Sequence, residues 1–153
     1  MSHQIRIATE TDLEQIMVIE KACFGNDAWS KANMNSELLA PHTTYVVAED
    51  GGALIGYAGL SKLEKSNSSD IQTIAVSDSH RGLGIGRALM NSLLEFASKQ
   101  GAKEVFLEVR EDKPTPQNLY NSLGFAEIDR RENYYQPDGV AAIVMRLDLE
   151  VQQ

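Results

Sequence analysis

Apolar residues recur along the chain with two different periods, and these periods outline an α/β protein. Alternating or short apolar runs predict seven strands, at residues 5–7, 45–48, 54–58, 71–76, 105–109, 125–128 and 142–149. Apolar residues spaced three to four apart predict four helices, at residues 11–23, 30–39, 85–100 and 115–123. The resulting order, β-α-α-β-β-β-α-β-α-β-β, predicts helices packed on a mixed central sheet of about six to seven strands.

Local signals mark where several of these elements begin and end. They are a capping box of Thr11 with Glu14, an N-cap at Ser30, a hairpin turn at residues 50–52, a C′ glycine at Gly101, and a cap at Thr115 followed by Pro116. The strand at residues 105–109 places Val105, Leu107 and Val109 on one face. Glu108 is therefore expected on the other face.

The composition fits one soluble domain that spans residues 1–153. Apolar residues make up 42% and no apolar run reaches 18 residues, so we expect no membrane span. The first residues lack the apolar segment of a secretory signal, and Cys23 is the only cysteine. These features indicate a cytoplasmic protein without disulfides, in which Cys23 is a packed apolar side chain.

The charge is unevenly distributed. The whole chain carries a formal charge of −8, which disfavours nucleic acid and anionic lipid as partners. Residues 80–103 nevertheless hold Arg81, Arg87, Lys99 and Lys103 against Glu95 alone. This basic segment indicates a site for an anion, whereas the acidic remainder favours a cationic partner.

A glycine-rich segment lies inside that basic region. The strand at residues 71–76 leads into Gly82, Gly84 and Gly86, and then into the long helix. Glycines let backbone N–H groups surround an anion, and a helix N-terminus adds partial positive charge, so a phosphate would fit. A nucleotide P-loop motif is absent, and a dinucleotide fingerprint would need glycine where Arg87 stands. A plain tight turn is the alternative.

The remaining motif, R-x-x-G-x-G over residues 81–86, resembles the pyrophosphate loop of the GNAT acetyltransferase superfamily. The resemblance covers nearly the whole chain and looks closest to bacterial ribosomal-protein-alanine N-acetyltransferases. Its other stretches are residues 29–30, 47–52, 73–76, 107–110, 119–125, 130–135 and 138–139. It implies a single-domain GNAT-like fold that binds acetyl-coenzyme A as co-substrate and needs no metal.

The resemblance also assigns the cofactor contacts. It implies that the backbone of Ile74, Ala75 and Val76 pairs with the pantetheine arm. The pyrophosphate would be held, mostly by backbone N–H groups, at Arg81, Gly82, Leu83, Gly84, Ile85, Gly86 and Arg87. Lys113 stands where related proteins usually have a cofactor-contacting asparagine, so a lysine–phosphate contact is expected there instead.

Two residues are candidates for the acid–base chemistry. From the residues alone, Glu108 reads as a solvated strand-end charge and Tyr120 as a core residue of a short helix. The resemblance implies instead that Glu108 accepts the proton of the amine and that Tyr120 protonates the departing thiolate. Asp70 is a reserve base. The three histidines are scattered and have no metal-ligand spacing.

The acceptor is the least constrained part of the prediction. The resemblance implies transfer to the N-terminal α-amine of a basic small-subunit ribosomal protein, by a monomer, with Tyr134 and Tyr135 in a loop near the acceptor groove. Ala141 replaces an aspartate common in the last loop. A lysine, a polyamine or an antibiotic amine could also serve as acceptor. Two different functions compete with acetyl transfer: a non-catalytic acyl-coenzyme A module and, last, a dinucleotide-dependent oxidoreductase.

Overall fold

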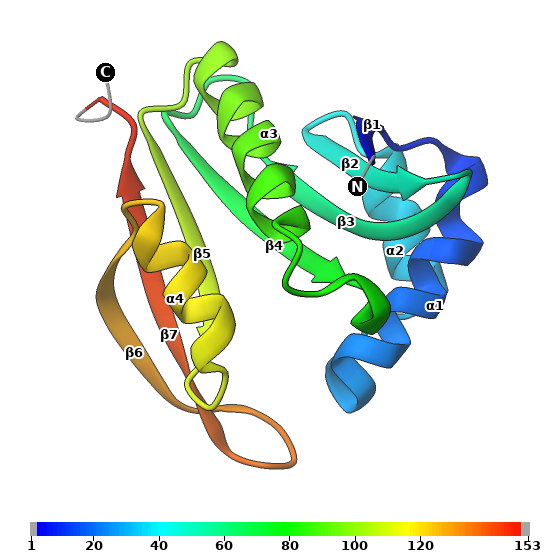
Figure 1. Ribbon diagram of the computed structural model, residues 1–153. Helices are drawn as coiled ribbons and strands as arrows, with labels where there is room; N and C mark the ends of the chain where they lie inside the picture. Colours follow the sequence, from blue (N-terminus) through cyan, green and yellow to red (C-terminus); the bar gives the residue numbers. More distant parts are fainter. Residues whose placement is uncertain (1–2, 151–153) are drawn as a thin grey trace.

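Seven strands form one mixed sheet in the order β1-β2-β3-β4-β5-β7-β6 in the computed structural model, which describes residues 3–150 (Figure 1). The strands are β1 Gln4–Ile7, β2 Thr43–Asp50, β3 Ala53–Ser61, β4 Ser68–Val76, β5 Glu104–Arg110, β6 Ala126–Tyr135 and β7 Val140–Asp148. The helices are α1 Leu13–Phe24, α2 Lys31–Leu39, α3 Ile85–Lys99 and α4 Pro114–Ser122, with short 3₁₀ turns η1 Glu10–Asp12, η2 Gly25–Asp27 and η3 Asp78–His80. The predicted element order and α/β class are confirmed.

Two apolar clusters cover the two faces of the sheet. Neighbouring residues of a strand point to opposite faces, so Val46 packs on one side and Val47 on the other. Val46 shares its cluster with Leu89 and Leu93 of α3 and with Tyr120 of α4. Val47 shares its cluster with residues of α1 and α2, such as Ile16 and Met34. The sheet therefore lies between the pair α1/α2 and the pair α3/α4 (Figure 1).

The sheet is parted between β4 and β5. The parallel register joins only residues 68–70 of β4 to residues 104–106 of β5, after which the two strands diverge (Figure 1). β5 instead pairs along its whole length with β7. Beyond Asp70, β4 is therefore bonded to β3 on one side only, and its other backbone edge is left facing the gap.

Several predicted boundaries are confirmed by their hydrogen bonds. The Ser30 hydroxyl accepts a bond of 3.0 Å from the Asn33 N–H at the start of α2. The hairpin between β2 and β3 turns at Gly51 and Gly52. Gly101 follows α3 with a φ of +86°, as a C′ glycine should. No helix within residues 3–150 is long and apolar enough to cross a membrane.

Two predicted helix starts are wrong. α1 is preceded by η1, and the capping box joins Thr9 and Asp12 instead of Thr11 and Glu14: the Asp12 carboxylate accepts a bond of 2.8 Å from the Thr9 N–H. Glu14 is free to pair with Lys31 of α2. α4 begins at Pro114 and not at the predicted Thr115-Pro116 step. Proline suits the first turn at either position, so local sequence alone could not choose between them.

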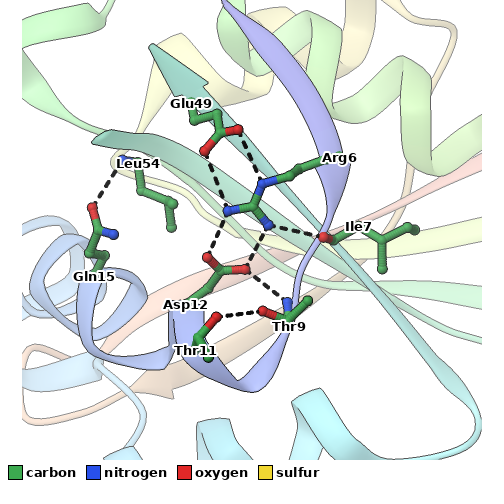
Figure 2. Close-up of polar contacts among 8 residues, drawn as sticks. All are labelled: Arg6, Ile7, Thr9, Thr11, Asp12, Gln15, Glu49 and Leu54. Carbon is green, nitrogen blue, oxygen red and sulfur yellow. Dashed lines mark hydrogen bonds and ion pairs between the residues drawn. The ribbon is translucent and has the colours of Figure 1, made fainter. Parts of the chain in front are cut away.

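Asp12 is also half of an ion pair that fastens the first strand to the fold. The Arg6 guanidinium lies 2.8 and 2.9 Å from the two Asp12 oxygens, and its Nε lies 3.2 Å from Glu49 of β2 (Figure 2). Nearby, the Gln15 side chain accepts a bond of 3.0 Å from the Leu54 N–H (Figure 2). These contacts join β1, the start of α1 and the β2–β3 hairpin.

Candidate active site

A cavity of about 390 Å³ occupies the gap between β4 and β5. Its walls come from α1, η2, both parted strands, the start of α4 and the β6–β7 turn. Side chains from both faces of the sheet reach it, because no strand pairing closes the sheet at this point. The cavity is therefore where groups carried by different layers can meet.

The glycine loop adjoins the C-terminal end of β4. Gly82 and Gly84 have φ values of +78° and +82°, and no atom lies within 4 Å of where a Cβ would stand at either one. Glycine is thus required there by backbone conformation and not by crowding. Gly84 is the N-cap of α3, so the N–H groups of the helix's first turn have no partner within the helix. This geometry suits an anion.

The side chains of the loop have other partners. The Arg81 guanidinium lies 2.8 Å from Asp78, 3.2 Å from the Val76 carbonyl and 3.3 Å from the Cys23 sulfur. Arg87 donates to the Ser122 hydroxyl at 2.8 Å. Ile85 is buried in the core and Leu83 is half exposed, so neither offers a polar contact. The Arg81 and Arg87 guanidinium groups are thus already bonded within the chain, although both residues remain exposed.

The side chains of residues 74–76 on β4 pack on the two faces of the sheet. Ala75 is buried against the α1/α2 face, whereas Ile74 and Val76 pack against the cluster on the α3/α4 face. Ala75 is buried, whereas Ile74 and Val76 are only partly buried. Ile74 lines the cavity directly.

Glu108 lines the cavity from β5, and its two oxygens have separate partners. Oε1 accepts a bond of 2.9 Å from the Tyr134 hydroxyl, and Oε2 lies 3.4 Å from the Arg131 guanidinium. Arg131 also lies over the Tyr134 ring, 5.9 Å from its centroid. The Glu108 side chain is 32% exposed, on the face opposite Leu107 and Val109, as predicted. Desolvation and the charge of Glu108 together raise the pKa of Asp70.

Tyr120 lines the same cavity from α4, on the other face of the sheet. Its ring packs edge-on against Phe125, with the centroids 6.1 Å apart, and it is 5% exposed. Burial raises the pKa of Tyr120 well above its ordinary value, so the hydroxyl stays protonated and can donate. The structure thus brings together the two residues that the sequence proposed for acid–base roles.

The two tyrosines assigned to an acceptor loop are in fact on a strand. β6 continues to Tyr135, which pairs with Val140, so the loop is confined to residues 136–139. The local sequence is rich in charged and polar residues, which obscured the strand's continuation. Both tyrosines lie near Glu108: Tyr134 bonds it, and Tyr135 lines the same cavity. Burial, followed by the charge of Glu108, raises the pKa of Tyr135 to about 12.

Lys113 and Ala141 mark the remaining departures from the expected pattern. Lys113 is the N-cap residue of α4 and lines the cavity. Ala141 was expected in the last loop, but it is buried on β7, where its carbonyl accepts a bond of 3.0 Å from the Glu111 N–H. Among residues 3–150, no three His, Cys, Asp or Glu side chains are grouped to hold a metal ion.

Sequence reasoning missed two parts of the cavity wall. Glu20 is 1% exposed, and its carboxylate accepts bonds from the Tyr57 hydroxyl and, at 2.9 Å, from the Trp29 N–H. A glutamate on the apolar stripe of α1 was the available signal. Arg110 is surrounded by three aspartates, of which Asp27 and Asp138 are far from it in sequence and gave no local signal.

Known proteins share this architecture. The family model described as "Acetyltransferase (GNAT) family" matches residues 13–125. The N-alpha-acetyltransferase RimI of Mycobacterium tuberculosis is 41% identical over 143 residues, which cover 92% of this chain and 89% of that protein. The ribosomal-protein-S18-alanine N-acetyltransferase of Escherichia coli superposes with a TM-score of 0.87 at 29% identity, over 96% of this chain and 94% of that one.

A more distant structure shares the fold alone. YncA of Salmonella typhimurium, solved with its cofactor acetyl-coenzyme A, superposes with a TM-score of 0.84 at 21% identity, over 97% of this chain and 95% of that one. The family match covers most of the chain, and the M. tuberculosis relative aligns over nearly all of it. This chain therefore belongs to the acetyltransferase (GNAT) family and is an acetyl-coenzyme A-dependent N-acetyltransferase.

Proposed function

We propose that this enzyme acetylates the N-terminal α-amine, with alanine as first residue, of a basic small-subunit ribosomal protein. The observation that carries the proposal is the shared cavity in the parted sheet, which is lined by Glu108, Tyr120 and the edge of β4. The names of the M. tuberculosis and E. coli relatives support an N-terminal acceptor and an alanine. A ribosomal acceptor would place the reaction in the cytoplasm, and we propose that the whole chain acts as one monomeric domain.

The chemistry divides among the residues of the cavity. Acetyl-coenzyme A supplies the thioester-bound acetyl group. Glu108 accepts a proton from the acceptor's ammonium, directly or through a water, so that the amine nitrogen can attack the acetyl carbon. Within residues 74–76, an N–H group that points to the free edge of β4 stabilises the carbonyl oxygen as negative charge develops. Tyr120 gives its proton to the departing sulfur as the carbon–sulfur bond breaks. The nitrogen loses its second proton to solvent as it becomes an amide, and solvent returns a proton to Tyr120. Both substrates are bound together during this direct transfer.

The glycine loop would hold the other end of acetyl-coenzyme A. The backbone N–H groups of residues 82–87 and the N-terminus of α3 fit a pyrophosphate, with Arg81 and Arg87 beside them. Lys113, at the cap of α4, is within the cavity wall and would reach a phosphate. This basic segment is compatible with a polyanionic co-substrate although the chain as a whole carries −8.

Charge and pKa favour a terminal amine on a basic protein. An α-amine has a pKa of about 7.7–8.0, against about 10.4 for a lysine side chain, so one carboxylate suffices near neutral pH. Tyr134 bonds Glu108 and Tyr135 lines the cavity, so both would contact the first residues of the acceptor. The negative charge outside the glycine loop would attract a basic protein.

Peptide acetylation tests this proposal. An Ala-starting basic peptide should be acetylated, whereas the same peptide with a blocked N-terminus and a free lysine, or a polyamine such as spermidine, should react slowly. Turnover of the polyamine but not of the peptide would contradict it. Glu108→Gln should lower kcat by about 10²–10⁴-fold. Glu95→Gln, an exposed carboxylate of α3 paired with Lys99, is the matched control and should leave kcat unchanged.

A further inference from the structure

Arg110 is the last residue of β5 and lies two positions after Glu108, so both side chains point to the same face. Its guanidinium bonds three carboxylates: Nη1 lies 2.6 Å from Asp27, Nη2 lies 2.8 Å from Asp138, and Nε lies 3.0 Å from Asp112. A second bond of 3.1 Å from Nη2 to Asp112 makes that contact bidentate. The Arg110 side chain is only 15% exposed.

The three aspartates belong to separate segments of the rim. Asp27 ends η2, which leads to Trp29 and α2, whereas Asp112 lies in the turn between β5 and α4. Asp138 lies in the turn between β6 and β7. A fourth segment is added by Tyr135, whose ring centroid lies 5.1 Å from the guanidinium carbon. Arg110, the three aspartates and Tyr135 all line the 390 Å³ cavity.

The Arg110 guanidinium therefore holds together three carboxylates at the rim of the cavity that would otherwise repel one another. Three carboxylates at one place disfavour one another, and the guanidinium offsets this because its planar fork donates in several directions at once. A lysine ammonium at the same position is a point charge on a flexible stem and could not reproduce the bidentate contact. With Arg110 in place the cluster still has a net formal charge of −2, which suits an approaching ammonium group.

We propose that Arg110 is a positioning residue that sets the acceptor end of the cavity, by fixing η2, the β5–α4 turn and the β6–β7 turn around one guanidinium. The proposal deepens the proposed function and rests on it for the identity of the acceptor. None of the side-chain partners of Arg110 belongs to the glycine loop. Losing Arg110 should therefore weaken use of the acceptor peptide more than use of acetyl-coenzyme A.

Steady-state kinetics with an Ala-starting basic peptide tests this separation. Arg110→Met, which keeps most of the stem, should raise the KM for the peptide about tenfold or more and change the KM for acetyl-coenzyme A less than about twofold. Arg110→Lys should recover only part of the loss. The matched control is Arg146→Met, because Arg146 bonds Glu104 at 2.7 Å without lining the cavity, and both KM values should stay unchanged.

Hydrogen exchange measured by mass spectrometry tests the positioning directly and needs no acceptor. Arg110→Met should speed exchange at residues 25–30 and 134–140, whereas Asp138→Asn, a milder change at an exposed partner, should speed it mainly at 134–140. Unchanged exchange in both segments would overturn the proposal, as would an equal rise of both KM values. If the wild type failed to acetylate any peptide, the proposed function would fall, and the exchange data would still decide the role of Arg110.

Discussion

In the ion pair between Arg6 and Asp12, removing one partner should lower the stability of the fold more than removing the other, because the two side chains are unequally buried. The Asp12 side chain is 5% exposed and that of Arg6 is 37% exposed. Arg6→Met leaves a buried carboxylate that keeps its hydrogen bonding to Thr9. Asp12→Asn leaves a half-exposed guanidinium that keeps Glu49. Removing the arginine should therefore be the more harmful change.

The magnitudes follow from this asymmetry. Removing one partner of a fully buried pair costs about 3–5 kcal/mol, and the exposure of Arg6 and the remaining Thr9 bond reduce this to about 2–3 kcal/mol. Asp12→Asn should cost about 1 kcal/mol, the loss of one hydrogen bond to a charged group that solvent can partly replace. For a chain of this size, Arg6→Met should lower Tm by roughly 4–12 °C.

Urea unfolding at pH 7 measures the free energy of unfolding of both variants. Lys99→Met is the control: Lys99 makes an exposed pair with Glu95, so its loss should cost less than about 0.5 kcal/mol.

The stability of this ion pair should also depend on pH, because the Arg6 guanidinium lowers the pKa of Asp12 in the folded protein. That stabilisation is complete above the unfolded pKa of about 3.9 and is lost as pH falls towards the folded pKa. The difference in the free energy of unfolding between wild type and Arg6→Met should thus become smaller below about pH 4. A larger loss for Asp12→Asn than for Arg6→Met would refute the reasoning.

Two further predictions concern the proposed chemistry. Tyr120→Phe keeps the ring packing on Phe125 and should lower kcat about 10²-fold with acetyl-coenzyme A. The loss of kcat should be much smaller with an acetyl thioester of a more acidic thiol, because that thiolate leaves without a proton. An equal loss with both thioesters would argue against Tyr120 as proton donor. Gly84→Ala forces a side chain into a φ of +82°, and calorimetry should show acetyl-coenzyme A binding weakened about tenfold or more. Gly101→Ala has the same strain at the far end of α3, so equal weakening there would contradict a role of the loop in binding.

Local sequence patterns predicted much of the fold. Alternating and helical periods indicated every strand and helix in order, and the Ser30 cap and Gly101 stop fall where expected because they depend on neighbouring residues alone. The glycine segment after the fourth strand also indicated an anion site from sequence. The wrong helix starts, at α1 and α4, involve residues with two local choices. Tyr134, Tyr135 and Ala141 were wrongly placed in a loop, because the pairing of β6 with β7 extends further than the local pattern indicated.

By itself, the sequence determined the element order, the α/β class and the position of the glycine loop, because short-range spacing encodes them. The tertiary structure alone decided that β4 and β5 part after Asp70, so that Glu108 and Tyr120, from opposite faces of the sheet, line one cavity. It also decided that Arg110 meets Asp27, which lies 83 residues away. Contacts of this kind depend on how layers pack, and no local period of the chain records them.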